Sequence, residues 1–341
     1  MEKQRITHNN HYVPQFYLRN WSKDGRTIYA YNLLVSDRRV PYWKKESIKN
    51  AAVWHDLYTR KIGQEEIDDF ETWFDHEFES PAKPVFDKLL QGERITKSEG
   101  ITLSRFVAAQ HIRTPARLDS ILELERQMLP SIMEDVLQKL NRQARSENFH
   151  HVQKFPAEKD DSIPLKVNLD KENGFVKVET IVGKGTYLYA VKHLLTETIK
   201  HMYGHRWNII HAANGISFPT SDDPVICLNY RNEQNYTFNG GWGLKHANII
   251  MPISPKLLLF TEIGSKNSCN SLDNSLYWSN FFRKIIIEHA HRSVFADVPQ
   301  KGMLAINPRI VSKELYAKGR KTVIYWHKEQ TLAEDTFNNP E

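Results

Sequence analysis

The spacing of apolar side chains changes along this chain, and this change is the strongest constraint on its fold. Between about residues 64 and 141, apolar residues recur every three or four positions, as in amphipathic helices. Later in the chain they gather in short runs at 207–212, 225–228, 247–251 and 257–261, which predict strands. This order predicts an α+β fold, in which a helix-rich N-terminal half packs on a mixed, mainly antiparallel sheet from the C-terminal half.

Helix-start and helix-stop residues divide the first half into three predicted helices. The first covers about residues 64–90, and its two prolines are expected to bend or interrupt it. The second opens with a capping box, Thr96 to Glu99, and runs to about Arg113. A Thr-Pro step ends it, and the third helix follows over about residues 116–141.

Shorter elements surround these helices. The chain opens with extended pieces, among them a predicted strand at 27–33. A hairpin is predicted over residues 165–181, with Asn173-Gly174 as its turn, and helices over about residues 186–203 and 274–292. Short strands are expected to close the chain.

The 341 residues are enough for one large domain or two smaller ones. We predict a single domain over residues 1–341. The alternative is a subdivision into a helical part, residues 1–145, and an α+β part, residues 164–341, joined by a polar connector at 146–163.

Composition and local patterns exclude several classes of protein. No apolar run approaches the roughly 18–20 residues of a membrane-spanning helix, so we expect no membrane partner. The first residues lack an apolar stretch with a small-residue cleavage site, so we expect no secretory leader. Two cysteines, Cys227 and Cys269, are too few for a disulfide framework or a four-thiolate zinc site. We therefore predict a cytoplasmic protein.

The common catalytic motifs are missing, since the sequence contains no phosphate-binding glycine loop, no HExxH and no GxSxG. The net charge is +5, and the densest basic stretch, residues 38–49, is interleaved with Tyr42 and Trp43. Such a mixture can line a phosphate-rich strand. We favour the alternative, a solvated hairpin edge guarded by lysine and arginine.

The N-terminal segment, residues 10–21, places His11 in front of an apolar, aromatic stretch that begins with Tyr12. In one interpretation the segment is tied into the core, and His11 is hydrogen-bonded and unreactive. In the other, His11 is a catalytic group, because histidine exchanges protons near neutral pH. In both we expect the segment to be buried.

Polar residues continue the apolar face of the second predicted helix. Gln110 and Arg113 follow its apolar residues at helical spacing, so they need partners if they are buried. On the first helix, Glu71 falls within the apolar face and Glu79 lies at its margin. A buried ion pair between Arg113 and either glutamate is one interpretation. In a second, Arg113 interacts with the last carbonyls of its helix, and in a third it presents a bidentate fork to a phosphate or carboxylate.

A third polar group, Ser221, Asp222 and Asp223, lies on a predicted loop between two strands. A turn held by hydroxyl and carboxylate side chains is the structural interpretation. The alternative is a carboxylate aimed at a pocket, as a metal ligand or general base. Because side chains alternate along an extended segment, only one of the two aspartates is expected to face such a site.

These segments, taken together, follow a known family pattern. The stretches HYVPQFYLRNW, LSRFVAAQHIRTPAR, FPTSDDPV and MPISPK occur in this order, and the pattern they belong to covers the chain from Asn10 to about Asn307. In that order and spacing, the chain resembles the bacterial family named for domain of unknown function 4238. The resemblance implies one shared fold in which these segments are drawn together. It implies no particular reaction, because the family name itself states that the function is unknown.

If the segments converge, they assemble a histidine, carboxylates, an arginine and an amide, which suit phosphodiester hydrolysis. We therefore predict a nuclease or nucleotide hydrolase, of a toxin-like or phage-defence type, that acts on nucleic acid or nucleotides with Mg²⁺ or Mn²⁺ as candidate cofactors. The predicted catalytic residues are His11, Gln110, Arg113, Asp222 and Glu79, and the predicted substrate-binding residues are Tyr12, Glu71, Ser221 and Asp223.

Each main catalytic residue has a predicted role. His11 acts as general acid or base, and Arg113 stabilises charge on a phosphoryl oxygen. Gln110 orients water or substrate, and Asp222 holds the histidine or a divalent ion. The alternative is a non-catalytic ligand-binding or interaction module, in which the same residues form a buried polar network. A cluster that opens to water favours the enzyme, whereas a sealed cluster favours the network.

Overall fold

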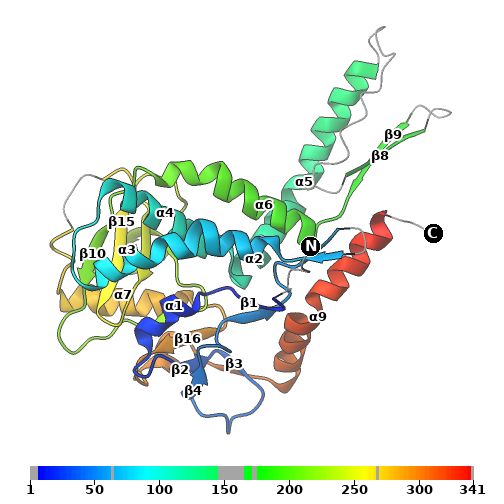
Figure 1. Cartoon of the computed structure of the whole chain (residues 1–341). Coiled ribbons are helices and arrows are strands. Elements are labelled where there is room, and N and C mark those ends of the chain that lie inside the picture. The colour runs from blue at the N-terminus through cyan, green and yellow to red at the C-terminus, as the bar shows by residue number, and fades with distance from the viewer. Residues whose placement is uncertain (1–6, 63–64, 145–164, 171–174, 266–268, 339–341) are drawn as a thin grey trace, which may run out of the picture.

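The computed structural model describes residues 7–62, 65–144, 165–170, 175–265 and 269–338, and Figure 1 shows how they are arranged. Helices lie mainly in the first half and antiparallel strands mainly in the second, so the predicted α+β class is confirmed. None of the helices in this described part combines the length and the apolar character needed to cross a bilayer.

The first predicted helix is one continuous rod with a wider turn in its middle. It consists of α2 (Asp69–Phe74), a π-helical turn η2 (Asp75–Glu79) and α3 (Ser80–Leu90). It begins later than predicted, because β7 (Glu65–Ile67) pairs with β6 (Arg60–Ile62) as a small antiparallel ladder. Strand pairing thus overrides the helical spacing at its start.

The other helices of the first half follow the prediction closely. In α4 (Lys97–Ile112) the Thr96 side chain and Glu99 form the expected capping box. After the Thr-Pro step, α5 (Pro115–Ala144) extends away from the body of the molecule (Figure 1). The helix expected at 186–203 is divided into α6 (Lys184–Thr196) and a 3₁₀ turn, η3 (Thr198–Met202).

The largest sheet is antiparallel throughout and comes from the C-terminal half. Its strand order is β10-β15-β14-β12-β13. The bounds are β10 (Asn208–His211), β15 (Leu257–Glu262), β14 (Asn248–Pro252), β12 (Ile226–Asn232) and β13 (Asn235–Thr237). All four longer strands were predicted.

A second, four-stranded antiparallel sheet joins the two ends of the sequence. Its order is β11-β16-β2-β4, with bounds β11 (Thr220–Ser221), β16 (Ser293–Ala296), β2 (Thr27–Asn32) and β4 (Lys44–Ser47). β4 is an edge strand, and the side chains of Lys44 and Lys45 are exposed. The predicted basic edge is therefore confirmed at these two residues.

Short strand pairs complete the described structure. β1 (Asn9–His11) pairs antiparallel with β5 (Val53–His55), whereas β3 (Leu34–Val35) pairs parallel with β17 (Ile310–Val311). The predicted hairpin is present as β8 (Leu165–Asp170) and β9 (Phe175–Thr180). Its Asn173-Gly174 turn and the connector predicted at 146–163 lie outside the described residues.

The prediction that short strands close the chain is wrong. After α7 (Leu276–His289), β16 and the short α8 (Met303–Ile306), the chain ends in α9 (Lys313–Asn338). This helix buries Trp326 but leaves Tyr325 and Leu332 exposed. Because only a narrow stripe of α9 is buried, its apolar residues do not produce the wide helical pattern that identified the earlier helices.

The five-stranded sheet lies between two helical layers. One face contributes Ile249, Met251 and Leu259 to the large core shared with the N-terminal helices. The opposite face contributes Ile250 and Leu258 to a second core against α7. Alternate residues of one strand therefore serve different cores, which explains why these strands are apolar without interruption.

The N-terminal segment is buried, as predicted. α1 (Gln15–Leu18) and the 3₁₀ turn η1 (Arg19–Trp21) pack against the segment around Pro252 and the loop around Phe218. The Tyr17 hydroxyl donates to the Pro252 carbonyl at 2.6 Å, and Trp21 Nε1 donates to the Phe218 carbonyl at 2.8 Å. Segments more than 190 residues apart are thus drawn together, which is what the family resemblance implied.

Candidate functional site

Arg113 is the centre of a buried polar cluster. Its Nη1 donates to Glu79 Oε1 at 2.6 Å, and its Nε and Nη2 donate to Gln110 Oε1 at 3.3 and 3.1 Å. The guanidinium also lies over the Phe74 ring, with 5.3 Å between Cζ and the ring centroid. Arg113 is 1% exposed, and of the two predicted partners the structure selects Glu79 for the direct ion pair.

The backbone holds this cluster together from two sides. Gln110 Nε2 donates to the Tyr12 carbonyl at 2.9 Å, so the end of α4 is bonded to the N-terminal segment. The Tyr58 hydroxyl donates to the Arg113 carbonyl at 2.6 Å, where α4 ends. Glu79 is the last residue of the π-helical turn. A π-helical turn holds more residues than an α-helical turn, so it shifts Glu79 around the helix axis towards the face that carries Glu71.

Glu71 is the second carboxyl group of this cluster. It is mostly buried, and burial raises its pKa to about 8, an effect that the positive charge of Arg113 opposes and the negative charge of Glu79 reinforces. Asn10 Nδ2 donates to Glu71 Oε2 at 3.4 Å. Glu71 is therefore largely protonated at neutral pH and able to donate a proton.

His11 lies at the partly exposed side of the cluster. Its Nε2 donates to the carbonyl of Lys49 at 3.0 Å, which leaves the Nδ1 lone pair as the basic site of the neutral ring. Burial lowers the pKa of His11 below its usual value, and the nearby charges of Glu79 and Arg113 act on it in opposite directions. His11 is therefore neutral at pH 7 and in the electrostatic neighbourhood of the ion pair.

The loop aspartates form a separate buried network. Both oxygens of Asp222 accept backbone N–H bonds, from His291 at 3.0 Å and Arg292 at 2.8 Å. Asp223 Oδ1 accepts from the Thr114 hydroxyl at 3.0 Å, and the Asp223 amide donates to Ser221 Oγ at 3.2 Å. The carboxylate oxygens of Asp222 thus have backbone partners, whereas the sequence predicted that they hold a histidine or a metal ion.

The predicted site residues therefore fall into two connected groups. In the first, Arg113 bonds directly to Glu79 and Gln110, and the charges of Arg113 and Glu79 act on Glu71 and His11. The second contains Ser221, Asp222 and Asp223, and the hydrogen bond from Thr114 to Asp223 joins it to the residue that follows Arg113. Tyr12 is buried between the groups. Its carbonyl accepts from Gln110 of the first group, and the negative charge of Asp222 in the second group adds to the effect of burial, which raises the pKa of the Tyr12 hydroxyl.

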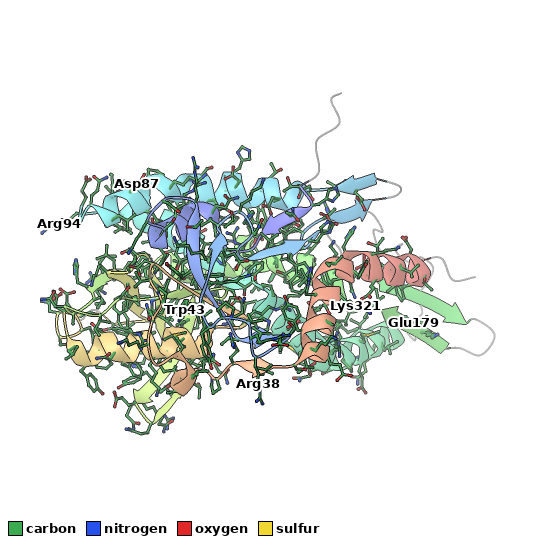
Figure 2. The ribbon with its side chains drawn as sticks, turned by 90° about the horizontal axis from the view of Figure 1, so that it is seen from below. Arg38, Trp43, Asp87, Arg94, Glu179 and Lys321 are labelled. Atoms are coloured by element: carbon green, nitrogen blue, oxygen red, sulfur yellow. The ribbon has the colours of Figure 1, made fainter. Side chains whose placement is uncertain are left out.

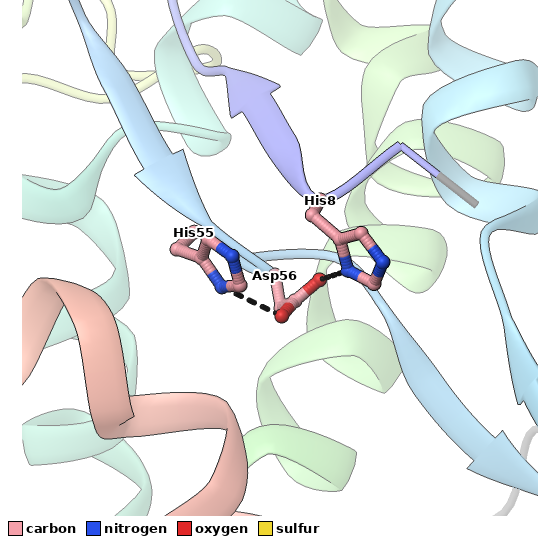
Figure 3. Close-up of side chains that lie close together, drawn as sticks. All are labelled: His8, His55 and Asp56. Carbon is pink, nitrogen blue, oxygen red and sulfur yellow. Dashed lines mark hydrogen bonds and ion pairs between the residues drawn. The ribbon is translucent and has the colours of Figure 1, made fainter.

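Sequence reasoning missed several residues that complete these contacts. Asn10 and Tyr58 bond directly to members of the first group, but neither belongs to a helical pattern that marks it. A separate group, His8, His55 and Asp56, gathers at the end of β1 and β5 (Figure 3). The adjacent His and Asp after a predicted extended segment are the signal that could have drawn attention to it.

One comparison with known proteins gave a match. A family model described as "Protein of unknown function (DUF4238)" matches residues 9–298, which is most of the chain. No curated protein and no solved structure matched. The match extends over all the segments on which the resemblance was based.

Proposed function

This chain belongs to the DUF4238 family, and from its own geometry we propose that it hydrolyses phosphodiester bonds in nucleic acids or nucleotides. The observation that carries the proposal is the combination of a neutral histidine and a protonated carboxyl group beside one ion pair. His11 has a lowered pKa and Glu71 a raised one, so a base and an acid coexist at neutral pH.

The two groups have complementary roles. His11 Nδ1 removes a proton from a water molecule as that water attacks phosphorus, and Glu71 gives its proton to the leaving oxygen. After the reaction His11 carries an extra proton and Glu71 has lost one. His11 then releases its proton to solvent and Glu71 takes one up from solvent, which restores the starting state. Both groups lie near the Arg113–Glu79 ion pair, which holds their surroundings in place.

Arg113 and Gln110 have positioning roles in this proposal. Because Arg113 is 1% exposed and its guanidinium donates to Glu79 and Gln110, it does not reach a substrate directly. This differs from the sequence prediction, which gave Arg113 to a phosphoryl oxygen. Instead the two residues fix Glu79 and the backbone at Tyr12, next to His11.

A phosphate-containing substrate is supported by the basic segment at residues 38–49. Lys44 and Lys45 are exposed on the edge strand β4, and the Lys49 carbonyl accepts the His11 hydrogen bond at 3.0 Å. Arg38 projects outwards from the body of the molecule (Figure 2). Exposed lysine side chains such as these are the kind that contact a phosphate backbone.

The free cysteines, Cys227 and Cys269, support a cytoplasmic location. A nuclease of this kind in a bacterial cytoplasm suits a toxin-like or phage-defence effector, because uncontrolled cleavage of cellular nucleic acid stops growth.

The test uses the full chain with single-stranded and duplex nucleic acids, tRNA and nucleotides, with and without Mg²⁺ or Mn²⁺. We expect cleavage by the wild type and a loss of at least about 100-fold in the His11→Ala and Glu71→Gln variants. His76→Ala is the matched control, since His76 is an exposed histidine on the same rod. The absence of cleavage in every arm, or full activity in His11→Ala, would contradict the proposal.

A second candidate is a non-catalytic ligand-binding module in which the network only stabilises the fold. The observation that favours it is burial, because Gln110, Arg113, Asp222 and Asp223 are each at most 2% exposed. In that case the His11→Ala and Arg113→Lys variants change thermal stability, and the wild type cleaves none of the substrates above.

A further inference from the structure

Two histidines and one aspartate lie together at the end of β1 and β5, outside the cluster around Arg113 (Figure 3). One ligand atom from each of His8, His55 and Asp56 lies within 4.8 Å of the other two. We infer that these three side chains bind a divalent transition-metal ion of the Zn²⁺ type. The inference is independent of the proposed hydrolase and of its candidate metals.

The strand register explains how the three side chains meet. β1 and β5 are antiparallel with Asn9 opposite His55, and the Asp56 amide donates to the His8 carbonyl at 2.8 Å one step further on. His8 is therefore directly across from Asp56. The backbone at Asp56 has a φ of 52°, in the left-handed region, so the strand ends there and the side chains of His55 and Asp56 no longer point to opposite faces.

The Nδ1 atoms of the two histidines approach the Asp56 carboxylate from two sides. Nδ1 of His8 lies 2.8 Å from Asp56 Oδ1, and Nδ1 of His55 lies 2.7 Å from Asp56 Oδ2. The two imidazole rings are nearly parallel, with 9° between their planes and 5.6 Å between their centroids. Bonds from such atoms to Zn²⁺ are about 2.0–2.2 Å long, so an ion held by all three would lie between them.

His55 provides the observation that a simple hydrogen-bonded network leaves unexplained. Its Nδ1 is buried and, among the described residues, has no hydrogen-bond partner of acceptable geometry, although Asp56 Oδ2 is 2.7 Å away. The two atoms form an ion pair when His55 is protonated, and when the ring is neutral they are placed as two ligands of one ion are. A metal ion would satisfy this nitrogen.

Asp56 is held by further contacts, as metal-binding carboxylates are. The Thr59 hydroxyl donates to Asp56 Oδ1 at 3.1 Å. Lys184 Nζ donates to the Asp56 main-chain carbonyl at 3.0 Å and contacts His327 Nδ1. Lys184 Nζ therefore fixes the backbone of Asp56 rather than its carboxylate.

The donor set indicates the class of metal. Imidazole nitrogens suit Zn²⁺ and neighbouring transition metals, whereas Mg²⁺ and Ca²⁺ prefer sites made of oxygen ligands. The side chains of His8 and His55 are 52% and 43% exposed, so the remaining coordination positions face solvent. Three protein ligands with an open position are typical of zinc sites that bind water or a further ligand.

The test is binding of Zn²⁺ alone to the full, tag-free chain, measured by competition with a chromophoric chelator and by the visible spectrum of the Co²⁺-loaded protein. We expect one Zn²⁺ per chain, no comparable binding of Mg²⁺, and an affinity lowered at least about 10-fold in His8→Ala and in Asp56→Asn. Circular dichroism of each variant establishes that it is folded, and His8, being half-exposed, tolerates replacement best.

His211→Ala is the matched control, because His211 forms a single His–carboxylate pair with Asp273, with Nδ1 2.9 Å from Oδ1. Its Zn²⁺ affinity is expected to equal that of the wild type. Binding that is absent in the wild type, or that survives both His8→Ala and Asp56→Asn unchanged, overturns the inference. The His11→Ala variant keeps its Zn²⁺ affinity, so this result stands or falls separately from the proposed hydrolase.

Discussion

Arg113 and Glu79 are 34 residues apart in the sequence, yet Arg113 Nη1 donates to Glu79 Oε1 at 2.6 Å inside the protein. The guanidinium is almost completely buried, while the carboxylate side chain retains 17% exposure. This ion pair joins the π-helical turn of the first rod to the end of α4. It therefore connects the two helices that carry most of the candidate site.

Removing the cation is expected to destabilise the protein strongly. Arg113→Ala leaves the partly buried Glu79 without its partner and the side-chain oxygen Oε1 of Gln110 without its two hydrogen bonds. The expected cost is about 3–5 kcal/mol in the free energy of unfolding. Urea denaturation measures this change. Arg105→Ala is the control, since the side chains of the Arg105–Glu77 pair are 33% and 52% exposed. A similar loss in both variants would show that the burial of Arg113 is not the cause.

The stability of the protein should fall as the pH rises through the neutral range because of Glu71. The folded state keeps Glu71 protonated up to a pKa of about 8, whereas the unfolded chain loses this proton near pH 4.5. Between these values the native state binds more protons, so the free energy of unfolding decreases by up to about 1.4 kcal/mol per pH unit. Denaturation from pH 5 to 8 should show a shallower decline for Glu71→Gln, and identical slopes would contradict the prediction.

If the proposed hydrolase is correct, its pH–rate profile should be bell-shaped. The rate rises as His11 loses its proton, which occurs below pH 6.5, and it falls as Glu71 ionises near pH 8. The rate of cleavage of one substrate, measured across this pH range, defines both the acidic and the alkaline limb of the profile. Glu71→Gln should remove the alkaline limb together with most of the rate, and a wild-type rate that increases steadily above pH 8 would exclude Glu71 as the acid.

The N-terminal segment should be essential for a stable fold. Removing residues 1–20 deletes the buried side chains of Tyr12, Val13, Tyr17 and Leu18, and each large apolar side chain contributes about 1.5–3 kcal/mol when fully buried. We expect a large decrease in melting temperature or no folded protein at all. A truncated chain that melts like the intact one would show that the segment is not part of the core.

The N-terminal cap of α4 offers a smaller and more local test. Thr96 Oγ1 accepts from the Glu99 amide at 3.2 Å, and Glu99 Oε2 accepts from the Thr96 amide at 2.7 Å. Thr96→Ala removes the first bond and should lower the free energy of unfolding by about 1 kcal/mol. Thr102→Ala, within the same helix, is the control, because its hydroxyl caps no terminus and only bonds back to Ser98.

Local patterns predicted most helices and strands because they report which side of an element is buried. The capping box at Thr96 and the apolar runs of β12, β14 and β15 were recognised in this way. The same reasoning failed at α9, whose buried stripe is narrow, and at Glu65–Ile67, where pairing with β6 overrides the helical spacing. Periodicity records burial along one element and contains no information on a pairing partner.

The sequence by itself predicted that Gln110 and Arg113 continue the apolar face of their helix and that a buried Arg113 needs a carboxylate partner. Only the tertiary structure decided that this partner is Glu79, that backbone amides hold Asp222, and that His8, His55 and Asp56 meet. The physical reason is that helical spacing fixes a side chain's direction relative to its own element. Which distant group it meets depends on how the elements pack, down to one wider turn in a helix or one left-handed residue at the end of a strand.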